Sequence, residues 1–265
     1  MGASGEETSQ KGNKLMKTIT TWNFKGGVGK TTTSYHVAAE LARRGLRVLL
    51  IDTDEQMNLS AMFEADFKKN AKKKSILELF NGNASIKDCI SKSRIENISY
   101  IKGSSIAKEN CNEIAFDVLR QKLDEIKEMF DFCIIDCHPD KFKVTENAIY
   151  AADTVLVPIK LDTFSRNNLN DVVEELNRVE ALSGKNGIDY FAFANFISIS
   201  KGQLAVFEDL MTTRDYSLAD IGVLKSADID NANYYRKPVY KHRSKSKSAN
   251  DYVALTDALI ERLGV

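Results

Sequence analysis

Short apolar runs alternate with longer amphipathic stretches along most of this chain. Several of the runs are continuously apolar, which is typical of parallel strands that helices cover on both faces. We predict seven strands, at residues 18–23, 47–52, 98–103, 132–136, 154–159, 190–197 and 221–224. The alternation predicts a doubly wound α/β fold, with a mostly parallel sheet flanked by helices.

The stretches between these runs have the periodicity of helices. One helix is expected after residue 29 and ends at Gly45, because glycine commonly follows the last helical residue. Segments 112–129 and 249–263 are also expected to be helical. A further helix is predicted where apolar residues recur at helical spacing, at Leu169, Val172, Val173, Leu176, Val179 and Leu182.

The domain organisation is predicted to be simple. Residues 1–15 are small and polar, which indicates a disordered tail or an expression remnant. No proline-rich or glycine-rich linker divides the remainder, and no internal repeat is visible. We therefore expect residues 16–265 to form a single domain.

Composition excludes several classes of protein. The 37 basic and 37 acidic residues cancel, so any surface for nucleic acid must be a local patch. No apolar run is long enough to span a membrane, and the first residues lack the apolar core of a secretory signal. The cysteines form no CxxC pair, which is typical of reduced thiols in a cytosolic protein: Cys89, Cys111, Cys133 and Cys137.

The stretch "NFKGGVGKTT" (23–32) lies between a predicted strand and a predicted helix. That position is typical of a loop that binds phosphate. The backbone N–H groups of Gly26, Gly27, Val28 and Gly29 are expected to curl toward an anion, aided by the partial positive charge of the helix N-terminus.

The residues after these glycines carry the expected contacts to a nucleoside triphosphate. Lys30 is expected to reach the β- and γ-phosphates, and the Thr31 hydroxyl to ligate Mg²⁺. Thr32 adds a hydroxyl near the α-phosphate. The strict G-x-x-x-x-G-K-[ST] pattern fails because Phe24 occupies its first glycine position, and a G-x-G-x-x-G pattern would need a glycine at residue 32.

The segment "KGGVGKTT" resembles the deviant Walker A motif of the ParA/MinD ATPases, in which a lysine precedes the glycines. The resemblance implies a P-loop NTPase fold and a homodimer that forms face to face around ATP. It also implies that Lys25 reaches across the interface to the nucleotide on the partner subunit, whereas Lys30 serves the nucleotide of its own subunit.

"VLLIDTDEQMNLS" (48–60) places Asp52 and Asp54 at the end of a buried strand. Strand alternation puts the two carboxylates on the same side of the sheet edge. The segment is similar to the "VLLIDxDPQGNLS" motif of the family. That similarity implies that Asp54 positions the attacking water and that Asp52 supports the Mg²⁺ shell. Glu55 and Met57 replace the proline and the glycine of the motif.

"FDFCIIDCHPD" (130–140) is a Walker B pattern, an apolar strand that ends in Asp136. This carboxylate is expected to hold Mg²⁺ through a water molecule. His138 and Asp140 depart from the "DCPPSLG" continuation of the family. His138 is a candidate general base, but a histidine beside an aspartate at a strand end is more often a local hydrogen-bonding residue, and we favour that interpretation.

Two residues are expected near the adenine base. Asn195 lies near the end of a predicted strand, where the family often contacts adenine with a polar side chain. Pro238 lies in "RKPVY", which resembles the "GKPIIxY" loop of the family beside the base.

The segment 236–248 concentrates basic residues without any acidic one. Lysine and arginine bind DNA phosphates without regard to sequence and in a salt-sensitive way. The family resemblance implies that the ATP dimer coats double-stranded DNA non-specifically through this part of the chain. A solvated basic loop is the alternative. The DNA-binding candidates are Arg236, Lys241, Arg243, Lys245 and Lys247, with Lys201 and Lys225 as looser matches.

The residues and the resemblance together predict an ATPase that partitions DNA, slow on its own and stimulated by a centromere-binding adaptor of the ParB type. Its expected location is the bacterial cytoplasm, on the nucleoid. The alternatives are a MinD-like or other cargo-positioning ATPase and a metallocluster ATPase of the same fold. The C-terminal segment 251–265 is acidic and lacks lysine, which disfavours the basic membrane helix that MinD-like proteins need.

Overall fold

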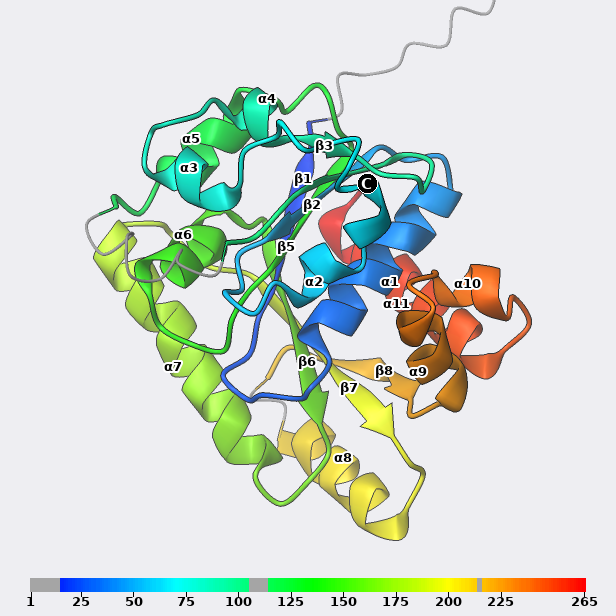
Figure 1. Ribbon diagram of the computed structural model, residues 1–265. Helices are drawn as coiled ribbons and strands as arrows, with labels where there is room; N and C mark the ends of the chain where they lie inside the picture. Colours follow the sequence, from blue (N-terminus) through cyan, green and yellow to red (C-terminus); the bar gives the residue numbers. More distant parts are fainter. Residues whose placement is uncertain (1–14, 105–113, 214–215) are drawn as a thin grey trace, which may run out of the picture.

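The computed structural model describes residues 15–104, 114–213 and 216–265. Of the predicted tail at residues 1–15, only Leu15 is within the described residues. The described chain forms an α/β fold with one mixed sheet and helices on both of its faces (Figure 1).

The sheet contains eight strands in the order β3-β4-β2-β5-β1-β6-β7-β8. All neighbours are parallel except β3, which is antiparallel to β4 at the edge of the sheet. The strands are β1 (Lys17–Thr21), β2 (Val48–Asp52), β3 (Ser91–Lys92), β4 (Ile98–Ile101), β5 (Phe132–Asp136), β6 (Thr154–Lys160), β7 (Tyr190–Ile197) and β8 (Leu218–Leu224). All seven predicted strands are confirmed within a few residues, and β3 is an addition.

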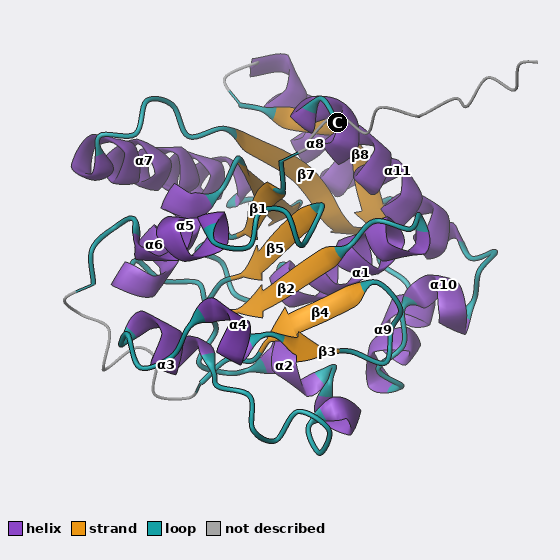
Figure 2. Cartoon of the chain, turned by 90° about the horizontal axis from the view of Figure 1, so that it is seen from above, coloured by secondary structure: helices purple, strands orange, loops and turns teal. Residues whose placement is uncertain are grey.

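The helices form two layers around the sheet, with α5, α6 and α7 on one face and α1 and α11 on the other (Figure 2). The long helices are α1 (Lys30–Arg43), α6 (Lys143–Ala151), α7 (Ser165–Ser183), α8 (Lys201–Thr213), α9 (Ala227–Tyr234) and α11 (Lys247–Leu263). The shorter ones are α2 (Asn58–Ala61), the 3₁₀ helix Glu64–Asp66, α3 (Ile76–Phe80), α4 (Ile86–Cys89), α5 (Val118–Asp124) and α10 (Val239–His242).

The continuously apolar strands supply both layers at once. Leu49 and Ile51 of β2 pack into the layer of α5–α7, whereas Val48 and Leu50 pack into the layer of α1 and α11. The two sets separate because successive strand residues face opposite sides of a sheet. A sheet covered on both faces thus explains why these strands lack polar alternation.

Several helix predictions need correction. The helix expected over 112–129 begins at Val118 and ends at Asp124, and turns follow as far as Met129; residues 112 and 113 lie outside the described part of the chain. The charged and apolar residues after Asp124 have a helix-like pattern, which led to the prediction of a longer helix. Leu182, assigned to the apolar stripe of α7, is 57% exposed because it lies in the last turn of that helix. Among the long helices, α6, α8 and α9 were not predicted.

Helix α11 buries its apolar face within the molecule. Tyr252, Leu255 and Leu259 pack in the layer that α11 shares with α1, and the helix also contacts β8. Burial of such side chains contributes roughly 1.5–3 kcal/mol each to folding. Among the described residues, no helix has the length and apolar character required to cross a membrane.

The sheet topology gathers polar residues at one edge. β1 lies next to β5, and β5 next to β2, so the carboxyl ends of three central strands meet. Their register pairs Asp136 with both Thr21 and Asp52. Ligands of open α/β sheets bind at this edge of the fold.

Candidate nucleotide-binding site

The glycine loop joins β1 to α1 at the carboxyl edge of the sheet. Gly27 and Gly29 adopt left-handed backbone conformations, with φ of 69° and 92°. A side chain at Gly29 would overlap the Asn195 amide and come within 2.8 Å of the Phe196 ring. Only glycine therefore fits this position, which opens helix α1 as its N-cap.

Lys30 folds back over the loop instead of extending into solvent. Its Nζ donates hydrogen bonds of 3.1 Å to the carbonyl oxygens of Asn23 and Lys25, and the residue is 8% exposed. Burial lowers the pKa of this ammonium group, and the nearby Asp136 carboxylate opposes part of that shift. A buried cation in the first turn of a helix that follows a glycine loop suits a polyphosphate.

Asn23 anchors the beginning of the loop. Its side chain exchanges two hydrogen bonds with Asn168 of α7, at 2.9 and 2.7 Å, and also donates to the Pro158 carbonyl of β6. Its Oδ1 accepts from the Lys25 amide. This role is not visible in the sequence, because Asn168 and Pro158 are more than a hundred residues away from Asn23.

Lys25 lies apart from Lys30. Its ammonium group forms an ion pair with Asp162, which follows β6, and both side chains are about one-third exposed. Burial raises the pKa of Asp162, but the hydrogen bonds from Lys25 and the Phe164 amide outweigh it and hold the pKa below its usual range. The two lysines of the loop thus have different partners and different exposure.

Asp136 ends β5 with no exposed surface. Its two carboxylate oxygens accept hydrogen bonds from the hydroxyls of Thr31, at 2.7 Å, and Ser34, at 3.1 Å. Burial, followed by repulsion from the Asp52 carboxylate, raises the pKa of Asp136 to about 8. The structure therefore joins Asp136 to Thr31, the two residues that the sequence predicts beside Mg²⁺.

Asp52 serves mainly as an anchor in this structure. Its Oδ2 accepts from both the amide and the hydroxyl of Ser60, each at 2.7 Å, and its Oδ1 accepts from the Asp54 amide. Burial raises its pKa to about 6 although these hydrogen bonds oppose the shift. The carboxylate holds the segment between β2 and α2 in place, and its role in a Mg²⁺ shell remains a prediction.

Asp54 borders a cavity of about 300 Å³ in front of the glycine loop. Its Oδ1 accepts from the Gln56 amide at 2.8 Å, and the residue is 6% exposed. The cavity is lined by Gly26, Gly27, Gly29, Lys30, Thr31 and Thr32 from the loop and α1, and by Asp54, Gln56, Asn58, His138 and Pro139 from the segments after β2 and β5.

His138 lies at the rim of this cavity and forms a local hydrogen bond. Its Nδ1 is 2.9 Å from Asp140 Oδ2, and its Nε2 is 3.9 Å from carboxylate oxygens of both Asp54 and Glu55. Asp140 also accepts hydrogen bonds from Thr145 and Phe142 at the start of α6. The local bond is the one that we favoured from the sequence.

These residues fit a magnesium nucleotide. The Thr31 hydroxyl and the Asp136 carboxylate present hard oxygen atoms, and two adjacent buried carboxylates are stabilised by a cation. Among the described residues, no group of three or more histidine, cysteine or acidic side chains could hold a metal alone. Mg²⁺ suits this arrangement, because it is usually held by few protein ligands together with phosphates and water.

The residues expected beside adenine lie close to the loop. Asn195 is fully buried, and its Nδ2 donates to the Val28 carbonyl at 2.8 Å, so it supports the loop from below. Pro238 is also buried and begins α10. Their contacts with a base remain predictions.

A hydrogen-bonded chain links the loop helix to the segment of Pro238. His36 Nδ1 accepts from the Val239 amide, so Nε2 carries the proton and donates to Asn233 Oδ1 at 3.1 Å. The Asn233 amide in turn donates to the Thr32 hydroxyl at 3.3 Å. Burial lowers the pKa of His36 to about 4, which keeps the ring neutral.

The structure brings together only some of the DNA-binding candidates. Arg236, Lys241, Arg243, Lys245 and Lys247 lie around α10 and the start of α11. Arg236 forms an ion pair with Glu64 at 2.5 Å, and Arg243 with Asp228 at 3.2 Å. Lys225 follows β8, and Lys201 begins α8, which lies apart from α10 in both views (Figures 1 and 2).

The cysteines bear on the metallocluster alternative. Cys133 and Cys137 are buried in the core around β5, and Cys89 is buried in α4. Cys111 lies outside the described residues. Burial raises the pKa of the Cys133 and Cys137 thiols well above the usual range, so these groups are poor metal ligands as placed.

Comparison with known proteins agrees with this geometry. A family model described as "AAA domain" matches residues 16–187. Maintenance of carboxysome distribution protein A from Synechococcus elongatus is 30% identical over 178 residues, which cover 64% of this chain and 69% of the relative. Chromosome-partitioning ATPase Soj from Treponema pallidum is 25% identical over 257 residues, which cover 94% of this chain and 98% of that relative.

A solved structure supports the same fold. Cobyrinic acid a,c-diamide synthase from Mycobacterium smegmatis, with a bound ATP analog and magnesium, superposes with a TM-score of 0.78 at 23% identity, covering 94% of this chain and 96% of that one. With the glycine loop, the buried lysine and the strand-end carboxylates in place, the chain belongs to the AAA-domain family matched above and is a P-loop ATPase of the ParA/MinD family.

Proposed function

We propose that this chain is an ATP-dependent partitioning ATPase, whose ATP-bound homodimer binds DNA non-specifically and leaves it after hydrolysis. The observation that carries the proposal is the separation of the two loop lysines. Lys30 is buried against the carbonyls of its own loop, whereas Lys25 is partly exposed on Asp162. Lys25 is therefore available for a second subunit once its ion pair is released.

The loop and α1 bind the nucleotide in this proposal. The N–H groups from Gly26 to Gly29 cradle the phosphates, and Lys30 neutralises their charge. Thr31 and Asp136 hold Mg²⁺, and Asp52 supports the shell of ligands around the ion. When bound, the metal ion supplies positive charge at the β- and γ-phosphate oxygens.

Hydrolysis depends on the segment after β2. Asp54 has one oxygen occupied by the Gln56 amide, and it lines the cavity where the γ-phosphate is expected. We assign it to orient the attacking water. Glu55 and Met57 replace a proline and a glycine in this segment, and Met57 adopts a left-handed conformation with φ of 51°. Such a backbone is costly for methionine, which fits a segment that rearranges with the nucleotide.

Nucleotide state controls DNA binding through dimerisation. Two subunits in the ATP state combine their basic segments around α10, whereas a single subunit offers only one. Only contacts that exist in the ATP dimer and are lost in the ADP state can shift this equilibrium. We assign Lys241, Lys245 and Lys247 to the DNA phosphates, because these exposed side chains form no ion pair within the described part of the chain.

Release requires hydrolysis, which is slow alone and accelerated by an adaptor of the ParB type in this proposal. The names of the Treponema pallidum and Synechococcus elongatus relatives, a chromosome-partitioning ATPase and a carboxysome distribution protein, support transport of cargo. A cytoplasmic, nucleoid-associated location follows.

The second candidate is another cargo-positioning ATPase of the family, and the carboxysome relative favours it. A membrane-bound member of the MinD type is less favoured, because the apolar face of α11 is occupied by α1 and β8. Co-sedimentation of the protein with anionic liposomes in the presence of ATP would favour a membrane-bound member of the MinD type instead.

Retardation of a non-specific DNA duplex at low salt tests the proposal. Wild-type protein with a slowly hydrolysed ATP analogue should retard the duplex, and salt should weaken the complex steeply. ADP, or the Lys30→Ala variant with the analogue, should give little retardation. Lys245→Glu/Lys247→Glu should abolish it, whereas Lys68→Glu/Lys72→Glu, with the same change of charge elsewhere, should not. Equal retardation with ADP and with the analogue would refute the proposal that the bound nucleotide controls DNA binding.

A further inference from the structure

A second large cavity lies at the opposite edge of the sheet. It measures about 1060 Å³ and is bordered by the residues that precede three strands: Arg47 before β2, Asn97 before β4 and Phe130 before β5. The nucleotide loop and its carboxylates lie at the carboxyl ends of the strands, whereas this second cavity, which we call the basic cleft, lies at their amino ends. The two sites are therefore on different edges of the molecule.

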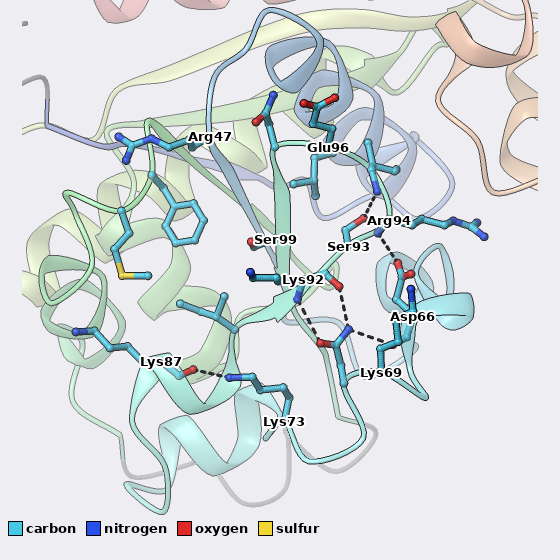
Figure 3. Close-up of a pocket in the computed structure, with 17 residues that line it drawn as sticks. Arg47, Asp66, Lys69, Lys73, Lys87, Lys92, Ser93, Arg94, Glu96 and Ser99 are labelled. Atoms are coloured by element: carbon cyan, nitrogen blue, oxygen red, sulfur yellow. Dashed lines mark hydrogen bonds between the residues drawn. The ribbon is translucent and has the colours of Figure 1, made fainter.

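The basic cleft is strongly cationic, although the whole chain has no net charge. Six of its lining residues are basic, namely Arg47, Lys69, Lys73, Lys87, Lys92 and Arg94, and two are acidic, Asp66 and Glu96. In Figure 3 most of the basic side chains surround the opening, and Lys92 lies near its middle.

Most of these cations are not neutralised by the protein itself. Arg47 forms an ion pair with Asp131. The four lysines and Arg94 form no ion pair with the described residues; Lys73 donates instead to the Lys87 carbonyl at 3.0 Å. Asp66 is 4% exposed, and its carboxylate accepts from the Arg94 amide at 3.1 Å. The cleft thus offers positive charge that no acidic side chain of the described residues pairs with, apart from Arg47.

The wall of the basic cleft is partly apolar. Ile90, Ile98, Met129 and Phe130 line it beneath the cations. Met129 is 42% exposed, so its side chain offers apolar surface to a ligand in the cleft. A ligand that only carried charge would leave this apolar surface in water.

The edge strand β3 borders the basic cleft, but its backbone is already occupied. The Asn70 side chain accepts from the Lys92 amide at 3.3 Å and donates to the Lys92 carbonyl at 2.9 Å, as a neighbouring strand would. An extended peptide therefore cannot add to the sheet at Lys92. A ligand must be recognised by the side chains of the cleft.

We propose that the basic cleft binds an acidic peptide segment of a partner protein, and that one apolar side chain of the segment packs on Met129 and Ile90. The positive charge of the cleft favours acidic residues in the bound peptide. The concave apolar wall favours an apolar side chain of that peptide over the phosphate backbone of a nucleic acid. The rigid, convex backbone of a DNA duplex does not reach into a cavity, so the cleft suits a peptide better than a duplex.

This inference goes beyond the nucleotide switch and does not depend on it. A segment bound at the amino ends of the strands displaces neither the nucleotide nor the basic residues around α10. A partner in the basic cleft can therefore remain attached while the ATPase cycles.

Fluorescence anisotropy with a labelled peptide of glutamate residues around a central Leu-Phe pair tests the proposal. The wild-type protein should bind this peptide more weakly as salt rises, and should bind a glutamine version of it at least roughly tenfold more weakly. The Lys69→Glu/Lys92→Glu variant should also lose about tenfold or more in affinity. Lys68→Glu/Lys72→Glu is the matched control, because these two lysines belong to the same segment but do not line the cleft; it should change affinity less than twofold.

Met129→Ser tests the apolar contact separately, and it should weaken binding several-fold without changing the salt dependence. ATP binding and the thermal midpoint of each variant establish that it is folded. Absence of salt-sensitive peptide binding by the wild-type protein, or equal losses in the cleft and control variants, would overturn the proposal. Loss of DNA binding in Lys69→Glu/Lys92→Glu without any peptide binding would instead assign the cleft to nucleic acid.

Discussion

Lys25 and Asp162 form an ion pair that ties the glycine loop to the turn between β6 and α7. In the account proposed above, Lys25 must leave Asp162 to reach a nucleotide on a second subunit. The pair therefore opposes dimerisation, and its strength sets part of the free energy that ATP must supply. An ion pair with this exposure contributes at most about 1 kcal/mol.

The Asp162→Asn variant should release Lys25 while keeping the hydrogen bond to the Phe164 amide. Each symmetric dimer contains two such pairs, so a gain of about 0.5–1 kcal/mol per pair should tighten the dimer that forms with a slowly hydrolysed ATP analogue roughly five- to thirtyfold. Sedimentation equilibrium measures this dissociation constant. A weaker dimer would show that Asp162 supports the interface instead of restraining it.

Gly29→Ala should destabilise the nucleotide-free protein. The left-handed backbone at Gly29 costs alanine about 1–2 kcal/mol, and overlap with Asn195 and Phe196 adds to this, so we expect a loss of roughly 2–4 kcal/mol. Urea unfolding measures it. Gly26→Ala is the control, because its added methyl group meets nothing within 4 Å; equal losses in the two variants would contradict the packing described for Gly29.

Asp54→Ala should lower the rate of ATP hydrolysis about a hundredfold or more, because the variant lacks the group that orients water. ATP binding should persist, so the protein should accumulate as a dimer on DNA. Single-turnover hydrolysis and duplex retardation report the two effects. Glu55→Gln, in the neighbouring position, should retain most of the rate. Normal turnover in Asp54→Ala would show that its role is misassigned.

His36 should make stability depend on pH. Its pKa is about 4 in the folded protein and 6.5 in the unfolded chain, so the unfolded chain binds more protons between these values. The contribution of His36 to the free energy of unfolding should therefore fall as pH falls from 6.5 toward 4, by up to roughly 3 kcal/mol at about 1.4 kcal/mol per unit. The raised pKa values of Asp52 and Asp136 act in the opposite sense, so this contribution must be measured against a variant without the histidine. Urea unfolding of wild type and His36→Asn at several pH values isolates this contribution. The free energy of unfolding of wild type relative to the variant should fall as pH falls from 6.5 toward 4, and a difference that does not change with pH would contradict the assignment.

The sequence predicted those features that depend on local pattern. Seven strands follow from apolar runs, and the loop with Lys30, Thr31 and Asp136 follows from motifs at strand ends. The ion pair of Lys25 with Asp162 was not predictable in this way, because it depends on β1 lying beside β6. Asp162 does carry a local signal, since it is an acidic residue shortly after a buried strand, much as Asp136 is the last residue of another.

Other features depend on packing that no local pattern encodes. Asn195 was expected beside adenine, yet its buried amide holds the Val28 carbonyl. Asn23 joins the loop to α7 through Asn168, and Asn233 joins α9 to Thr32. Helix α8 was missed because only Leu210 in it is fully buried, so its apolar pattern is weak.

The central claim is that Lys25 serves a second subunit. Sedimentation velocity with ADP and with a slowly hydrolysed ATP analogue, on wild-type protein and on Lys25→Ala, tests it most directly. We predict a wild-type monomer with ADP and a dimer with the analogue, whereas Lys25→Ala binds the analogue but remains monomeric. A Lys25→Ala dimer as stable as that of wild type, or a wild-type protein with the same oligomeric state in both nucleotides, would contradict the account.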